Sequence, residues 1–201
     1  SNSEEILKAT IKYYYHNAST ILYLFPCFIV LSIGFAGCFN IVKKLVWLEK
    51  VDYVNAFKKG IQGNIIKILI NSLLLTIIYV IYCMTNLYIL FNEISLFLMI
   101  ILIIIAALLV VFIMNILFCG YAQMVLYTNG IFNYLKNSII FSTLSFPRSF
   151  IIIISSLILV PIGFLFENVV GIVVVFSFYL LIGFGYAILL FILNYFEIFD
   201  R

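Results

Sequence analysis

Long apolar stretches alternate with short groups of charged residues along the whole chain. The uncharged gaps hold 30 residues between Lys12 and Lys43, 25 between Lys67 and Glu93, 42 between Glu93 and Lys136, 18 between Arg148 and Glu167, and 29 between Glu167 and Glu197. A helix needs about 20 mostly apolar residues to cross the hydrocarbon core of a bilayer. Each gap is therefore predicted to hold one span, and the five predicted spans are residues 20–42, 68–91, 94–119, 149–166 and 169–193.

The apolar runs are predicted to be helices rather than strands. A transmembrane strand alternates in character at every second residue, whereas residues 100–105 and 151–154 are apolar without interruption. A continuous apolar run satisfies its backbone groups in lipid only as a helix. The expected fold class is all-α, a polytopic helical membrane protein with about five transmembrane helices, and residues 1–201 are expected to form a single integral membrane domain.

Composition supports a membrane protein and excludes a soluble globular domain and a disordered chain. Hydrophobic residues make up 66% of the chain and charged residues 9%, against roughly 45–50% and about 25% in an ordinary soluble domain. So few charges cannot cover a soluble surface, and the hydrophobicity is too high for a disordered chain.

Basic residues are distributed unevenly between the two sides that five spans would define. Most of them fall on one side, namely Lys43, Lys44, Lys50, Lys58, Lys59, Lys67, Lys136, Arg148 and Arg201. The positive-inside rule places that side in the cytoplasm, so the N-terminus is expected outside and the C-terminus inside a bacterial cell membrane. Residues 1–19 could lie on either face if the first apolar stretch is a re-entrant hairpin. The net charge of +3 then reflects topology and contact with the lipid bilayer, and no nucleic-acid partner is predicted.

Three segments combine an apolar and a polar face at helical spacing and are predicted to be interfacial amphipathic helices in the plane of the headgroups. They are residues 3–15, the segment that follows Asp52, and residues 131–146. In the second segment Phe57 lies on the apolar face, and Lys58 and Lys59 lie opposite. Such segments are either membrane anchors or docking surfaces for a partner.

Small residues mark two candidate packing faces. The first span contains Pro26, Gly34 and Gly37, which indicate either a close approach to another helix or, less favoured, a broken helix that lines a substrate path. In the last span Gly183 and Ala187 are four residues apart and share one helical face. Because lipid is as apolar as leucine, helices in a bilayer associate through such small residues, so this face is predicted to pack against a helix of the chain or of a partner.

Recognisable catalytic motifs are absent from the sequence. It has no GxxxxGK[ST], HExxH or GxSxG pattern,, and His16, Glu49 and Asp52 are predicted to be non-catalytic. The four cysteines lie within predicted spans without CxxC spacing, so no metal, cofactor or redox site is expected. The polar residues left inside the spans are amides and hydroxyls such as Asn71, Asn86, Asn115 and Gln123. They are predicted to join helices by hydrogen bonds, with binding of an uncharged solute as the alternative.

Two stretches are similar to the YesL-like family of bacterial membrane proteins. The first is SIGFAGCFNIVKKLVWLEKVDYVNAFKKGIQGNIIKILINS, and the second is YLKNSIIFSTLSFPRSFIII. The matching residues are Ser32, Ile33, Gly34, Ala36, Lys43, Lys44, Glu49, Phe57, Asn64 and Lys67 in the first, and Leu135, Asn137, Ser138, Pro147 and Arg148 in the second. The resemblance implies a poorly characterised family whose members are often encoded beside carbohydrate ABC importers and glycoside hydrolases.

Taken with the absent chemistry, this resemblance favours a non-enzymatic accessory membrane subunit of a bacterial carbohydrate ABC importer. Its expected partners are the lipid bilayer and the importer's permease subunits. The residues proposed to contact partners or neighbouring helices are Gly34, Phe57, Lys58, Lys59, Asn64, Pro147, Arg148, Gly183 and Ala187. The alternative is a stand-alone transporter or channel for a neutral solute, and a membrane enzyme comes third.

Overall fold

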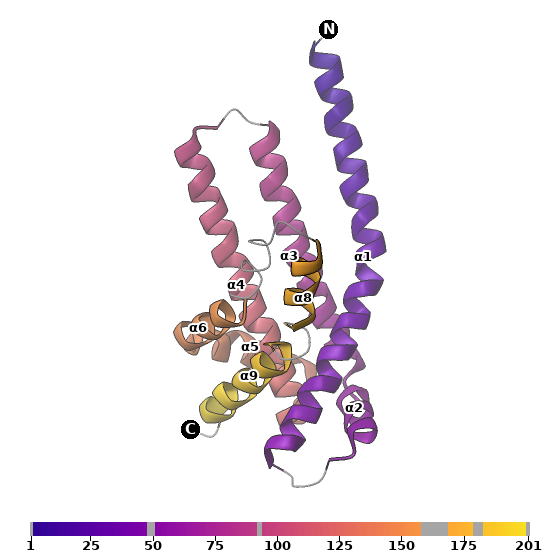
Figure 1. The fold of residues 1–201 in the computed structure, drawn as a ribbon, viewed down its shortest axis with the longest axis vertical. Coiled ribbons are helices and arrows are strands. Elements are labelled where there is room, and N and C mark those ends of the chain that lie inside the picture. The colour runs from indigo at the N-terminus through magenta and orange to yellow at the C-terminus, as the bar shows by residue number, and fades with distance from the viewer. Residues whose placement is uncertain (1, 48–50, 92–93, 158–168, 179–182, 200–201) are drawn as a thin grey trace.

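The computed structural model describes residues 2–47, 51–91, 94–157, 169–178 and 183–199, and every regular element among them is a helix (Figure 1). The helices are α1 (Asn2–Trp47), α2 (Tyr53–Ile61), α3 (Ile65–Phe91), α4 (Leu96–Leu126), α5 (Ile131–Leu144), α6 (Phe146–Leu157), α8 (Val169–Phe178) and α9 (Phe184–Phe199). The all-α class is therefore confirmed for the described part of the chain.

Three helical segments are long and apolar enough to cross a membrane. They are Ser19–Trp47, Ile65–Leu90 and Leu96–Leu126, and they match the first three predicted spans. A fourth is reached if Ile131–Leu144 and Phe146–Ser155, which meet at a bend of 82°, are counted as one broken span. These helices indicate a multi-pass membrane protein. The two remaining predicted spans extend into residues 158–168 and 179–182, which lie outside the described residues, so the number five stays a prediction.

Helix α1 differs from the sequence-based expectation. Residues 3–15 were expected to form a separate interfacial helix, but α1 runs without a break from Asn2 to Trp47. No glycine or proline stands between residues 13 and 25 to end it, and the helix also continues through Pro26. Its N-terminal part extends past the α3–α4 hairpin in Figure 1. The broken-helix interpretation of Gly34 and Gly37 therefore has no counterpart in the backbone of α1.

Helix α2 begins as the sequence predicts. Asp52 is its N-cap and accepts a hydrogen bond from the Asn55 backbone N–H at 3.2 Å, which satisfies one of the free amides of the first turn. The Asn55 backbone and side chain hold the pKa of this exposed carboxyl below its ordinary value. After α2 the chain turns at Gly63, whose φ of 79° favours glycine,.

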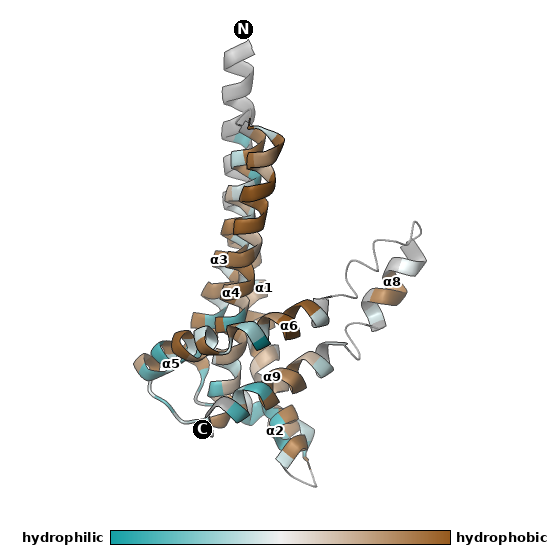
Figure 2. Ribbon diagram, turned by 90° about the vertical axis from the view of Figure 1, so that its left-hand side faces the viewer, coloured by the Kyte–Doolittle hydropathy of each residue, from teal (hydrophilic) through white to brown (hydrophobic). Residues whose placement is uncertain are grey.

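The buried core lies at the end of the molecule where α2, α5, α6 and α9 surround the long helices (Figures 1 and 2). Rings from α1, α4 and α9 pack there: Phe35 stacks on Tyr121 with centroids 5.2 Å apart, and Phe118 stacks on Phe191 at 4.4 Å. The α3–α4 hairpin projects away from this core, and in Figure 2 it is coloured largely as hydrophobic. The buried polar side chains described in the next subsection lie within the same end of the molecule as this core.

Candidate functional site

Buried polar side chains gather around the C-terminal half of α4. They are Ser32, Asn40, Lys67, Asn71, Ser72, Asn115, Gln123, Ser138, Ser142, Ser145, Ser149 and Asn194. Moving a polar group out of water is costly unless it gains a hydrogen bond. A buried polar side chain whose hydrogen bonds are made within the protein is therefore a structural contact. One that lacks a hydrogen-bond partner could bind a ligand.

One group, which we name the Asn115 cluster, is well satisfied. The Asn115 side-chain amide donates to the Ser142 carbonyl at 2.7 Å, and the Tyr195 hydroxyl donates to Asn115 Oδ1. Ser149 Oγ lies 3.4 Å from that hydroxyl and accepts from Asn194 Nδ2 at 3.3 Å. These bonds join α4, α5, α6 and α9 on the inside of the α5–α6 bend, so the cluster stabilises the corner rather than offering a binding site.

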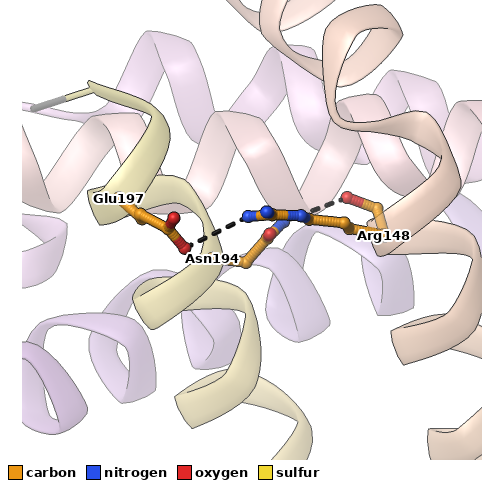
Figure 3. Close-up of polar contacts among 4 residues, drawn as sticks. Arg148, Asn194 and Glu197 are labelled. Carbon is orange, nitrogen blue, oxygen red and sulfur yellow. Dashed lines mark hydrogen bonds and ion pairs between the residues drawn. The ribbon is translucent and has the colours of Figure 1, made fainter. Parts of the chain in front are cut away.

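Arg148 and Glu197 form an ion pair at the outer edge of this cluster, between α6 and α9. The distance from Arg148 Nη1 to Glu197 Oε2 is 3.1 Å, and Figure 3 shows the two side chains reaching toward one another. Both are more than half exposed, so solvent weakens the attraction, and such pairs contribute little to stability. The predicted contact residue Arg148 thus has a partner within its own chain, and Pro147 beside it is exposed.

A second group, the Asn71 cluster, is only partly satisfied. The Tyr134 hydroxyl donates to Asn71 Oδ1 at 2.7 Å, directly over Gly120, where a Cβ would lie 2.3 Å from that hydroxyl. The Tyr121 hydroxyl lies beside Ser32 and Asn71. Even so, Ser32 Oγ, Asn71 Nδ2 and Tyr121 Oη form no hydrogen bond of normal geometry within the described residues. These three side chains lie close to one another, and none of them lines either of the cavities described below.

A cavity of about 220 Å³ opens at the corner between α4 and α5. Its lining consists of Gln123, Tyr127, Asn129, Asn137 and Phe141. Gln123 Nε2 donates to Ser138 Oγ at 3.3 Å, while Gln123 Oε1 has no hydrogen-bond partner in the described chain. Three carboxamides offer both donors and acceptors without a charge, so the lining suits an uncharged polar molecule.

A second cavity, of about 510 Å³, lies between the first turns of α3 and α5. It is lined by Gly63, Ile65, Ile66, Lys67, Asn129, Gly130 and Ile131. Lys67 is only 7% exposed, and its ammonium lies 5.6 Å from the centre of the Tyr134 ring. Asn129 borders both cavities, so the two form neighbouring hollows at one end of the bundle.

Of the contacts predicted on α1 and α2, Phe57 lies at a close crossing of the two helices. A Cβ built on Gly37 would be 2.2 Å from the Phe57 ring, and one built on Gly60 would be 2.5 Å from the Ala36 carbonyl oxygen. A Cβ on Gly34 would meet no heavy atom within 4 Å. The backbone approach that small residues permit is therefore centred on Gly37 and Gly60.

The remaining predicted contact residues are scattered. Lys58 and Lys59 are exposed on α2, and Asn64 uses its side-chain amide to donate to the Gly60 carbonyl at 3.2 Å. Ala187 is buried in α9, and Gly183, directly before α9, is half-buried. The structure does not bring the predicted residues together into one site.

The residues that do converge were largely missed by sequence reasoning. Helix α5 buries Tyr134, Ser138 and Ser142, a stripe with a spacing of four residues. The amphipathic pattern of residues 131–146 instead emphasises the larger apolar residues of the same segment. The signal in the sequence is a tyrosine on the same helical face as small hydroxyl residues. Tyrosines of membrane spans otherwise gather near the headgroups, so this alignment indicates a buried polar stripe.

No protein-family model, curated protein or solved structure matches the chain. Its resemblance to the YesL-like family therefore stays a prediction.

Proposed function

We propose that this protein is a non-enzymatic membrane subunit that binds helices of a partner within the bilayer, as an accessory component of a bacterial carbohydrate importer. The supporting observation is uneven burial, because the most apolar stretch of α4 has no buried residue while the opposite end of the same helix is tightly packed. The carbohydrate importer comes from the YesL-like resemblance.

A groove on the exposed half supports a helix as the occupant. It lies between α3 and α4, has a volume of about 360 Å³ and includes Thr85, Asn86, Ala106, Ala107 and Val110 in its lining. Two adjacent alanines permit close backbone approach, and an amide with a hydroxyl can bond across helices. Such a surface fits the small-residue face of a permease helix.

Co-purification from native membranes in mild detergent tests this function. We expect permease subunits to co-elute at a fixed stoichiometry, and Ala107→Phe to reduce co-elution because the ring fills the groove. Leu109→Phe, an exposed position on the same helix outside the groove lining, is the matched control. Equal co-elution of wild type and both variants, or no permease subunit at all, would contradict the proposal.

A second candidate function is transport of a small neutral solute, and the 220 Å³ cavity favours it. Carboxamides and aromatic rings line that cavity, and none of its lining residues is charged. Purified protein that moves a polyol or monosaccharide into liposomes without other subunits would support this function. Asn137→Leu should then lower uptake while leaving the protein folded.

We propose that the α2 end faces the cytoplasm, with the N-terminus outside. The connections before α3 and before α5 line one cavity, which supports placing the basic residues around them on one side. A single cysteine at the exposed position Gln62, in a chain without Cys27, Cys38, Cys83 and Cys119, should resist impermeant thiol reagents in intact cells. Rapid labelling there would reverse the orientation.

A further inference from the structure

We infer that the 510 Å³ cavity between α3 and α5 is a binding site for a phosphate-bearing anion, of the kind carried by an anionic phospholipid headgroup. This inference is independent of the proposed function. It rests on two helix N-termini, one buried lysine and an apolar rim, all of which border the same cavity.

Both helices direct their first turns at the cavity. The first intrahelical backbone bond of α3 runs from Ile68 N to Asn64 O, and that of α5 from Tyr134 N to Gly130 O, both at 2.9 Å. The three N–H groups before each bond have no intrahelical acceptor. Gly130 caps α5 without a side-chain hydrogen bond. Amides of this kind, together with the positive end of the helix dipole, form an anion site.

Lys67 is a second, independent indication that the cavity binds an anion. Its side chain lines the cavity and is more than nine-tenths buried. No described carboxylate lies within ion-pair distance of its ammonium, since the ion pair in the described part of the chain joins Arg148 and Glu197. The Tyr134 ring is its aromatic contact. A buried charge is costly without an opposite charge, so an anion in the cavity would stabilise it.

The rim favours a lipid as the source of that anion. Ile65, Ile66 and Ile131 border the cavity with 63%, 57% and 42% of their surfaces exposed. Apolar rim residues suit an acyl chain, and a water occupies roughly 30 Å³ in the liquid, so 510 Å³ is far more than inorganic phosphate fills. Basic pockets between transmembrane helices are known to hold anionic headgroups. Free phosphate shares the headgroup chemistry and is separated from it by experiment.

The test uses the purified full-length protein in detergent micelles, with binding followed by native mass spectrometry and thermal stability. Three probes are compared: phosphatidylglycerol, phosphatidylcholine and inorganic phosphate. We expect phosphatidylglycerol to bind and raise the melting temperature, and phosphatidylcholine to do so at least about 10-fold more weakly, because it carries no net charge. If inorganic phosphate binds and the lipid does not compete, the anion site stands and its source is soluble phosphate.

Two variants act on different parts of the site. Lys67→Gln removes the ammonium and should weaken phosphatidylglycerol binding about 10-fold or more, the usual scale of a charge-assisted hydrogen bond. Lys59→Gln, the same change at an exposed position outside the lining, should change it less than about twofold.

Gly130→Asp keeps the proposal falsifiable if the first variant does not fold. A Cβ at Gly130 meets nothing within 4 Å, and its φ of −62° suits any residue. An aspartate there caps α5, so the fold should be kept or stabilised, while its charge occupies the free amides and repels an anion. Lipid affinity within twofold of wild type for both Lys67→Gln and Gly130→Asp, or equal binding of the two lipids by a wild type that does not bind inorganic phosphate, would overturn the inference.

Discussion

The two halves of α4 have opposite environments although they belong to one helix. Between Leu96 and Val110 no residue is buried, whereas Asn115 and every residue from Leu117 to Val125 are buried. The exposed half consists almost wholly of large aliphatic side chains, and the buried half contains Asn, Cys, Gly, Tyr, Ala and Gln. The more hydrophobic half is thus the less buried one.

This reversal follows from the solvent. In water, the burial of large apolar side chains lowers the free energy of the folded protein. Lipid is as apolar as leucine, so burial of these side chains gains no such stabilisation in a bilayer. Contact between helices then depends on close approach at small residues and on hydrogen bonds between polar ones. Helix α5 follows the same rule, because it turns Tyr134, Ser138 and Ser142 inward and leaves Ile131 and Ile139 exposed.

The largest expected effect comes from overfilling the buried half. Gly120→Leu would place a Cβ 2.3 Å from the Tyr134 hydroxyl and 3.3 Å from Asn71 Oδ1, so we expect the free energy of unfolding to fall by about 1–3 kcal/mol or more. Ala107→Leu adds comparable bulk to the exposed half and should change it by less than about 0.5 kcal/mol. Unfolding in mixed micelles with increasing SDS measures both, and equal losses would remove the distinction between the halves.

A smaller loss is expected from removing a buried amide. Asn115→Leu removes the hydrogen bond to the Ser142 carbonyl and the one from the Tyr195 hydroxyl to Asn115 Oδ1 and should cost about 1–2 kcal/mol. Asn86→Leu is the control, since Asn86 donates to the Tyr82 carbonyl of its own helix. The same SDS titration applies, and a larger loss at Asn86 would show that the exposed half carries the stabilising contacts.

Removing one hydroxyl should have a modest effect. Tyr134→Phe deletes the hydrogen bond to Asn71 Oδ1 and keeps the ring under Lys67, so about 0.6 kcal/mol is expected, the average for such bonds in a membrane protein. Tyr82→Phe, at a residue 63% exposed, should have no measurable effect. A double-mutant cycle with Asn71→Ala isolates the pairwise energy.

The smallest effect concerns pH and the two helix caps at opposite ends. The pKa of Asp52 is lowered by the Asn55 hydrogen bonds, so folding favours the ionised carboxylate. Its contribution is fully present above the unfolded pKa of about 4 and is lost as the pH falls through the lower folded pKa. Amide protection factors of α2 should therefore decrease below about pH 4. Those at the start of α4, capped by the non-titrating Ser95, should not.

Asp52→Asn keeps a capping oxygen without an ionisable group. The variant should abolish the pH dependence of α2 and leave its protection at neutral pH nearly unchanged. A pH response that persists in Asp52→Asn would assign the effect to another group.

The sequence predicts the long helices well because the bilayer imposes their length. Residues 68–91 and 94–119, for example, correspond to helical segments of the structure. Which face each helix buries was harder to predict. In α2 the large side chains Tyr53 and Val54 are exposed, and Ala56 and Gly60 are buried against α1. Patterns of large apolar residues locate contact with lipid here, and patterns of small residues locate contact between helices.

The candidate site could be predicted only in its parts. Asn71, Asn115 and Gln123 stand out as polar residues in apolar surroundings, but nothing in the spacing shows that Tyr134 reaches Asn71 from a helix 63 positions away. The bend between α5 and α6 does have a local signal. Pro147 lies in the first turn of α6, where its missing N–H is tolerated, and it cannot continue the hydrogen bonding of α5,. The angle of the bend between α5 and α6, 82°, depends on packing against α4 and α9, which the sequence does not show.

The length of α1 exceeds what one crossing of the bilayer requires. At 1.5 Å per residue, the 46 residues of this helix extend about 69 Å, more than twice the roughly 30 Å thickness of the hydrocarbon core. Phe28 and Phe35 of α1 pack in the core of the protein, and Gly37 and Asn40 pack against α2. The part of α1 from Asn2 to Cys27 precedes these contacts and extends about 39 Å,. A crossing of the bilayer by α1 therefore leaves about half of the helix outside the hydrocarbon core.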